Sequence, residues 1–149
     1  MTSAQIAQPV DFPQPIRLHW AFVLILGALT AGLFGAAWLI VQANWVRKVR
    51  GGWLAEGLAI SNACVSLVVL LAGRMHTQAG LAWAQSDYAD GLVFAFWVAA
   101  VYTLRAELVA EPIGLFLGWF APFFFGPVYF QYHLQEFGKS EEAGRPLGL

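Results

Sequence analysis

The chain has 149 residues, of which 59% are hydrophobic and 11% are charged, and its formal net charge is −1. A soluble domain has about 45–50% apolar and about 25% charged residues, so this composition cannot cover a water-facing surface with polar side chains. The balance of 8 basic and 9 acidic residues also excludes a general basic surface for nucleic acid. The composition indicates a small integral membrane protein whose first partner is the lipid bilayer.

The first membrane helix is predicted near residues 18–43, in a stretch that contains no Asp, Glu, Lys or Arg. About 20 apolar residues are enough to cross about 30 Å of hydrocarbon, so this stretch is long enough for one full span. Gly32 and Gly35 interrupt it. A re-entrant hairpin that turns back at residues 32–35 is the alternative to a full span.

Three further helices are predicted near residues 53–73, 89–109 and 113–135, where apolar residues dominate and charges stand close to the ends. The last of these contains Pro122 and Pro127. Each proline removes a backbone hydrogen bond that hydrocarbon cannot replace, so we expect this helix to be kinked and packed against its neighbours.

The fold class predicted from these stretches is an all-α bundle of four transmembrane helices joined by short hairpin loops, over residues 18–137. Residues 1–17 are polar and rich in proline, and residues 138–149 are polar and charged. The first segment is expected to lie extended on the surface, and the second to be a mobile tail. Four crossings place the two tails on the same side of the membrane.

Three basic residues, Arg47, Lys48 and Arg50, lie between the first two predicted helices with no acidic residue among them. Short loops with an excess of Lys and Arg stay in the cytoplasm. These three residues are therefore the predicted topology determinants. With four crossings, both termini are expected on the non-cytoplasmic side of a cell membrane.

Three polar side chains stand inside the second predicted helix: Glu56, Asn62 and Ser66. An ionisable group inside a membrane helix is costly and by default suggests a proton or substrate path. Glu56 can instead belong to a rim of salt bridges, because it lies near the headgroups and the basic loop. Asn62 and Ser66 can form an ordinary hydrogen bond between helices rather than line a pore.

The three histidines, His19, His76 and His133, fall near helix ends on one predicted face of the membrane. Neutral imidazole binds zinc, copper and haem iron, so convergence of the three would form a metal or haem site. No two of them have a ligand spacing such as H-x-x-x-H, and histidine is also common at the membrane interface. No cofactor is therefore predicted, and a haem or metal centre is kept as an alternative.

Small residues recur at intervals of four along the predicted helices, and the glycines on these faces include Gly32, Gly35, Gly114 and Gly118. This interval returns to one face of a helix, where small side chains let two backbones approach closely. Such faces predict close packing, either inside the bundle or within a homo-oligomer or larger membrane complex.

The segment from Leu29 to Trp38, LTAGLFGAAW, is followed by Gln42, Asn44 and the basic loop. It resembles a family of uncharacterised small multi-pass proteins of the bacterial inner membrane, in which a Gly-aromatic-Gly-x-x-Trp segment ends in polar residues. The resemblance implies a location in that membrane. It implies no activity, because the family is a domain of unknown function.

These features favour a non-catalytic integral membrane protein, an accessory or scaffold subunit that acts through helix–helix contacts. An enzyme is less favoured, because motifs such as G-x-S-x-G and H-E-x-x-H do not occur in the sequence. One alternative is a small transporter or channel with a polar path near Glu56 and Asn62. The other is a haem- or metal-binding membrane subunit that uses the three histidines.

Overall fold

The computed structural model describes residues 13–14, 18–74, 82–83 and 85–142, so His76 and most of the two predicted tails lie outside the described residues. Over the described residues the fold is all-α, as predicted, with five helices and no strand. The helices are α1 (Trp20–Leu29), α2 (Leu33–Arg50), α3 (Leu54–Arg74), α5 (Asp87–Val109) and α6 (Ala121–Glu142).

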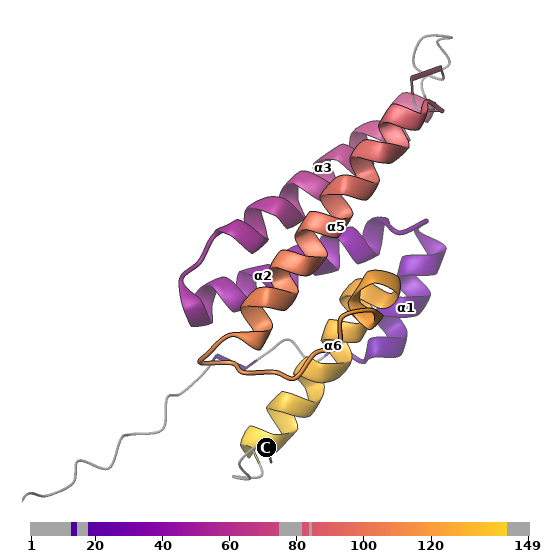
Figure 1. Ribbon diagram of the computed structural model, residues 1–149. Helices are drawn as coiled ribbons and strands as arrows, with labels where there is room; N and C mark the ends of the chain where they lie inside the picture. The colour runs from indigo at the N-terminus through magenta and orange to yellow at the C-terminus, as the bar shows by residue number, and fades with distance from the viewer. Residues whose placement is uncertain (1–12, 15–17, 75–81, 84, 143–149) are drawn as a thin grey trace, which may run out of the picture.

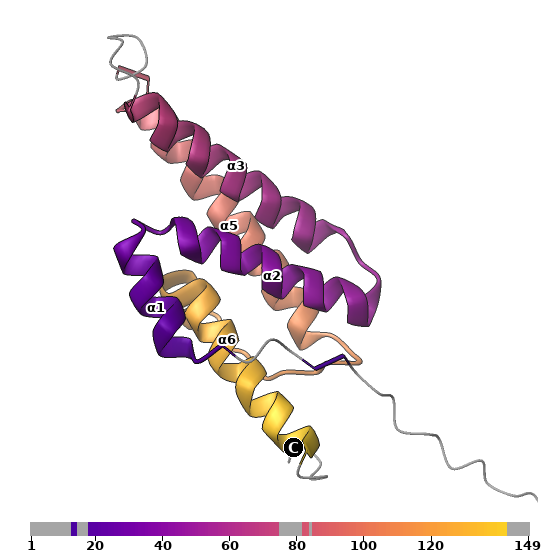
Figure 2. The same ribbon diagram turned by 180° about the vertical axis from the view of Figure 1, so that it is seen from behind.

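Helices α3 and α5 lie side by side as an antiparallel pair, and α2 packs along them (Figures 1 and 2). Helix α6 contacts α1, α2 and α5 at one end of this group. The core contains several small or branched side chains that are fully buried, which lets the helices approach closely. The residues with 0% exposure on α2, α3 and α5 are Leu39, Ala43, Ala59, Ala89, Ala100, Val101, Leu104 and Leu108.

Among the described helices, α3 and α5 are long and apolar enough to cross a membrane. Within the apolar windows of these helices, 22% and 28% of the residues are buried inside the protein. Most residues in these windows are therefore at least partly exposed, whereas a core helix of a soluble protein is mostly buried. The two helices correspond to the predicted stretches at 53–73 and 89–109. Four crossings are not shown, because the other helices do not meet the same criterion.

The prediction of one continuous first helix over 18–43 is wrong, because the chain breaks between α1 and α2. Ala31 and Gly32 have φ angles of +50° and +87°, in the left-handed region that a helix cannot continue through. The Thr30 hydroxyl donates to the Leu26 carbonyl at 2.7 Å and accepts from the Phe34 amide at 2.9 Å. Thr30 thus satisfies backbone groups on both sides of the break, which makes the break tolerable in apolar surroundings.

Helices α1 and α2 form a V whose point is this break (Figures 1 and 2). The Trp45 indole donates to the Pro13 carbonyl at 2.5 Å, so the chain before α1 lies beside the carboxyl-terminal half of α2. The Phe137 ring of α6 packs edge-on against the same indole, with 6.3 Å between centroids. Residues near both ends of the described chain therefore meet close to the basic end of α2.

The predicted helix over 113–135 is also wrong in its first third, because α6 begins at Ala121. Residues 113–120, the strap, run without helical structure across the bundle. Burial alternates along the strap: Ile113, Leu115 and Leu117 are buried, whereas the residues between them are exposed. Alternation is what an extended chain with one face on a core produces. Gly114 and Gly118 therefore do not form the helix-packing face predicted for them.

Arg105 of α5 holds the strap in place. Its guanidinium donates to the Gly118 carbonyl at 3.0 Å and to the Leu117 carbonyl at 2.7 Å. The guanidinium carbon also lies 4.0 Å from the centroid of the Trp119 ring, within range of a cation–π interaction. Tyr129 accepts from the Gly118 amide through its hydroxyl at 3.0 Å. These contacts supply the strap with the hydrogen bonds that a helix would make internally.

The predicted kink in the last helix is confirmed, and it lies at Gly126, directly before Pro127. Gly126 has a φ angle of +33°, and a Cβ atom added there would lie 2.6 Å from Cζ2 of Trp97. Pro122 is the second residue of α6, where the first turn of a helix needs no amide donor. The break lets α6 pass over Trp97 of α5 at a distance that no other residue type permits.

Replacing Gly126 with Ala should destabilise the fold by about 2–4 kcal/mol, because the added carbon meets the Trp97 ring and the left-handed backbone is strained. Gly91→Ala is the matched control, since a Cβ at Gly91 meets nothing within 4 Å. That control should be neutral or stabilising by up to about 1 kcal/mol in helix α5. Thermal unfolding in detergent, followed by circular dichroism, measures both. Equal midpoints for the two variants would contradict the close contact at Gly126.

Candidate functional site

A cavity of about 490 Å³ lies between α2, α3 and α5, next to the break that separates α1 from α2. We call it the α2–α3–α5 pocket. Ala31, Gly32, Leu33, Gly35 and Ala36 form its wall at the break. The opposite walls are mainly apolar and come from α3 and α5, with Val69, Leu70, Val93, Phe94 and Trp97. The volume is in the usual range for a small-molecule site.

The break explains why this space is not filled by side chains. Helix α1 turns away from α3 and α5 at Gly32, so residues of the first apolar segment no longer continue along them (Figure 2). Four of the five residues at the break wall are Ala or Gly. At Gly32, a Cβ atom would meet nothing within 4 Å. Small residues at a change of direction thus leave a cavity where a continuous helix with large side chains would have closed it.

Asn62 of α3 lines the pocket and is 1% exposed. Its Oδ1 atom is buried and has no hydrogen-bond partner in the described part of the chain. Leaving such a buried acceptor unpaired costs about 1–3 kcal/mol, and folded proteins rarely do so. Oε1 of Gln42, away from the pocket, is buried and unpaired in the same way. The unpaired oxygen of Asn62 therefore does not by itself mark a ligand site.

Ser66 lines the pocket one turn beyond Asn62, so two of the three residues predicted for a polar path share this site. Asp90, in the first turn of α5, is the one charged residue among the described lining residues, and it is exposed. The sequence alone placed Asp90 on the same predicted face as the histidines and did not connect it with Asn62 and Ser66. Its relevance comes from the antiparallel packing of α5 against α3.

Glu56, the third residue of the predicted path, does not line this pocket. One carboxylate oxygen lies 2.7 Å from Nη1 of Arg47, and the other accepts from Nδ2 of Asn44 at 2.8 Å. Arg50 forms a second ion pair, with Glu107 near the end of α5. Two of the three predicted topology determinants thus tie the end of α2 to α3 and α5, while Lys48 is exposed.

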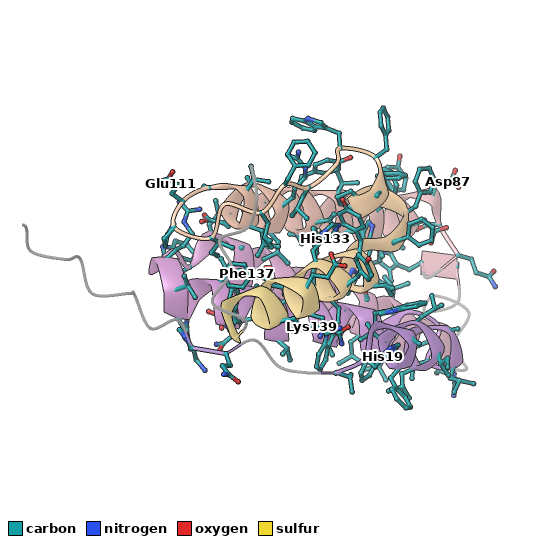
Figure 3. All side chains as sticks on the ribbon, turned by 90° about the horizontal axis from the view of Figure 1, so that it is seen from below. His19, Asp87, Glu111, His133, Phe137 and Lys139 are labelled. Atoms are coloured by element: carbon teal, nitrogen blue, oxygen red, sulfur yellow. The ribbon has the colours of Figure 1, made fainter. Side chains whose placement is uncertain are left out.

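The two described histidines belong to different parts of the fold (Figure 3). His19 precedes α1, and its Nδ1 accepts from the Ala21 amide at 3.3 Å. His133 of α6 packs on Tyr129, with ring centroids 4.6 Å apart. Among the described residues, no group of three or more His, Cys, Asp or Glu side chains could hold a metal ion. The haem or metal alternative stays a prediction, since His76 lies outside the described residues.

A polar cluster between α2 and α6 was not anticipated. The Gln42 amide donates to the Pro127 carbonyl at 2.8 Å, and the Trp38 indole donates to Oε1 of Gln131 at 3.0 Å. Gln131 in turn donates to the Leu18 carbonyl at 2.8 Å. Two buried glutamines in apolar helices are the sequence signal that could have revealed it, because buried amides need partners. This cluster fixes α6 against α2 and is structural.

Asn62→Leu should leave the unfolding midpoint unchanged or raise it, because the substitution removes an unpaired buried acceptor. Gln131→Leu is the matched control at a second buried amide. It should lower the free energy of unfolding by about 1–3 kcal/mol, because it leaves the Trp38 indole without its acceptor and removes one of the two amides that donate to the Leu18 carbonyl. Thermal unfolding of both variants in detergent distinguishes the two cases. If Asn62→Leu lowered the free energy of unfolding as much as Gln131→Leu, Asn62 would be a structural residue.

No family model matches this chain, and no curated protein or solved structure is significantly similar to it. The resemblance to small inner-membrane proteins therefore stays a prediction.

Proposed function

We propose that this chain is an integral membrane protein of the small-transporter class, which binds a small solute in the α2–α3–α5 pocket. The observation that carries the proposal is a pocket at a helix break, beside two candidate spans, with the polar residues Asn62, Ser66 and Asp90 in its otherwise apolar lining. Non-helical backbone at membrane depth is tolerated where it lines a cavity, and broken helices of this kind form solute sites in transporters.

Placement in the membrane is supported by the outward faces of the two candidate spans. Exposed apolar side chains on α3 and α5 include Ile60, Leu67, Val68, Leu71 and Leu92. The strap adds exposed aromatic rings at Phe116, Trp119 and Phe120. A surface of this kind is stable in hydrocarbon and would drive aggregation in water.

In the proposed topology α3 and α5 cross the membrane, and the V of α1 and α2 enters and leaves on one side. Arg47, Lys48 and Arg50 are then placed in the cytoplasm by their positive charge. The contacts of Trp45 with Pro13 and Phe137 support a cytoplasmic position for the adjoining ends of the chain. This differs from the expectation of non-cytoplasmic termini, which depended on four full crossings.

The accessory or scaffold function expected from the small-residue faces has less support. Ala43, Ala59 and Ala100 are fully buried within one chain, so their small size is accounted for by packing inside the bundle. Gly114 and Gly118 lie in the non-helical strap. A partner subunit would use the exposed aromatic side chains of the strap. Contact with lipid accounts for the exposure of these side chains equally well, so no partner is needed to explain it.

Cysteine accessibility in lipid vesicles tests the proposed function. In a Cys64→Ser background, Ser66→Cys places a thiol in the pocket, and Val68→Cys places one on the outward face of α3. Iodoacetamide, a neutral reagent, attacks the thiolate, which forms in water and not in hydrocarbon. The thiol at 66 should react at least about tenfold faster than the thiol at 68. The thiol at 68 faces hydrocarbon, where the reactive thiolate does not form.

Equal, negligible rates at the two positions would mean that the pocket is dry or filled by lipid, and would overturn the proposed function. Equal, fast rates would place both faces of α3 in water and would overturn the membrane assignment as well. A free thiol in solution gives the reference rate for the reagent.

A further inference from the structure

The α2–α3–α5 pocket has one negatively charged side chain and no Lys, Arg or His in its described lining. The carboxylate of Asp90 is an exposed acceptor, and the Ser66 hydroxyl can donate or accept. The Asn62 amide has both an acceptor and donors, so it does not select the charge of a ligand. The charge of the lining therefore favours a cationic ligand over an anionic one.

The aromatic lining favours the same kind of ligand. Trp97 and Phe94 of α5 both line the pocket. A cation over the face of a tryptophan ring is attracted by the ring quadrupole, and the attraction grows when water is excluded. Trp97 is held against Gly126 of α6, so its ring is fixed by close packing on one side. A rigid ring binds a cation at little cost in side-chain freedom.

The partial charges at the helix break do not reverse the preference of the pocket for a cation. The amino end of α2 carries a partial positive charge, but the carboxyl end of α1 with its partial negative charge lies directly beside it. The two partial charges are about half a unit each and offset one another, whereas Asp90 carries a full charge. Thr30 also occupies donors of the first turn of α2, through bonds from the Leu33 and Phe34 amides.

We propose that the pocket binds a small organic cation, an alkylammonium with an apolar chain. The ammonium group binds against the ring of Trp97, and the apolar chain lies along Val69, Leu70 and Val93. The exposed Asp90 lies toward the other end of the pocket and draws cations in by long-range attraction. This inference rests on the proposed function and specifies its substrate class.

Charged thiol reagents test the role of Asp90. In the Cys64→Ser, Ser66→Cys background, the rate of a trimethylammonium-ethyl thiosulfonate is compared with that of an ethylsulfonate thiosulfonate. Each rate is normalised to the same reagent with a free thiol. Asp90→Asn should lower the cation-to-anion ratio by about fivefold, because it removes the one charge in the described lining of the pocket. A changed pKa of the thiol cancels in the ratio.

Asp87→Asn is the matched control, because Asp87 is an exposed acid on the same turn of α5 and does not line the pocket. It should leave the ratio within about twofold, since a more distant, solvated charge is screened. An unchanged ratio in Asp90→Asn, or a preference for the anionic reagent in the parent, would overturn the inference. The reaction with neutral iodoacetamide is independent of both results, so the proposed function can stand while the cation preference fails.

Protection experiments test the role of Trp97. n-Butylammonium should slow iodoacetamide labelling at position 66, and Trp97→Leu should raise the concentration needed for half-protection by about tenfold, through loss of the cation–π attraction. Phe96→Leu is the matched control, because Phe96 is on the same helix and does not line the pocket. Absence of protection by n-butylammonium, or an equal effect of the two substitutions, would overturn the assigned contact.

Discussion

Backbone hydrogen bonding in apolar surroundings is the constraint on which the rest of this structure depends. The chain leaves helical geometry at Thr30–Gly32, along the strap and at Gly126, and at each place side chains take over backbone groups. The Thr30 hydroxyl forms hydrogen bonds on both sides of the first break, and Arg105 donates to two carbonyls of the strap. Beside the break at Gly126, the Gln42 amide donates to the Pro127 carbonyl. Without these partners each irregular segment would cost several kcal/mol in hydrocarbon.

The first break has the largest consequence, because it creates both the pocket and the arrangement of the chain ends. A straight helix from Trp20 to Arg50 would lie along α3 and α5 and would leave α6 without a neighbour on that side. The V of α1 and α2 instead receives α6, through Gln131 and Gly35. An added Cβ at Gly35 would lie 3.8 Å from Cγ of Pro127, so the two helices meet closely there. The space left beside α3 and α5 is the pocket.

The sequence predicted the all-α class and the two apolar stretches that became α3 and α5, because a long run of apolar residues has few other stable arrangements. It did not predict the break as the main outcome. Glycines occur often within membrane helices, and composition alone cannot show that Thr30 will bridge the two sides. The strap could not be predicted from the sequence for a similar reason. Its period-two pattern at Ile113, Leu115 and Leu117 lies inside a phenylalanine-rich run that is equally consistent with a span.

The site was partly predictable. Asn62 and Ser66 stand out as polar residues in an apolar helix, and both line the pocket. Glu56 stands out for the same reason but is paired with Arg47, a contact that depends on how α2 turns into α3. Asp90 and Trp97 reach the pocket through the antiparallel register of α5 against α3, which no local pattern in the sequence specifies.

A distance between spin labels on α1 and α2 tests the break, and with it the pocket, most directly. Phe22 and Lys48 are both exposed and can carry the labels in a Cys64→Ser background. In one continuous helix these positions would be about 39 Å apart, at a rise of 1.5 Å per residue. The V of α1 and α2 predicts a single distribution well below that value in lipid vesicles. A distribution centred near the continuous-helix distance would remove the wall of the pocket and contradict the account.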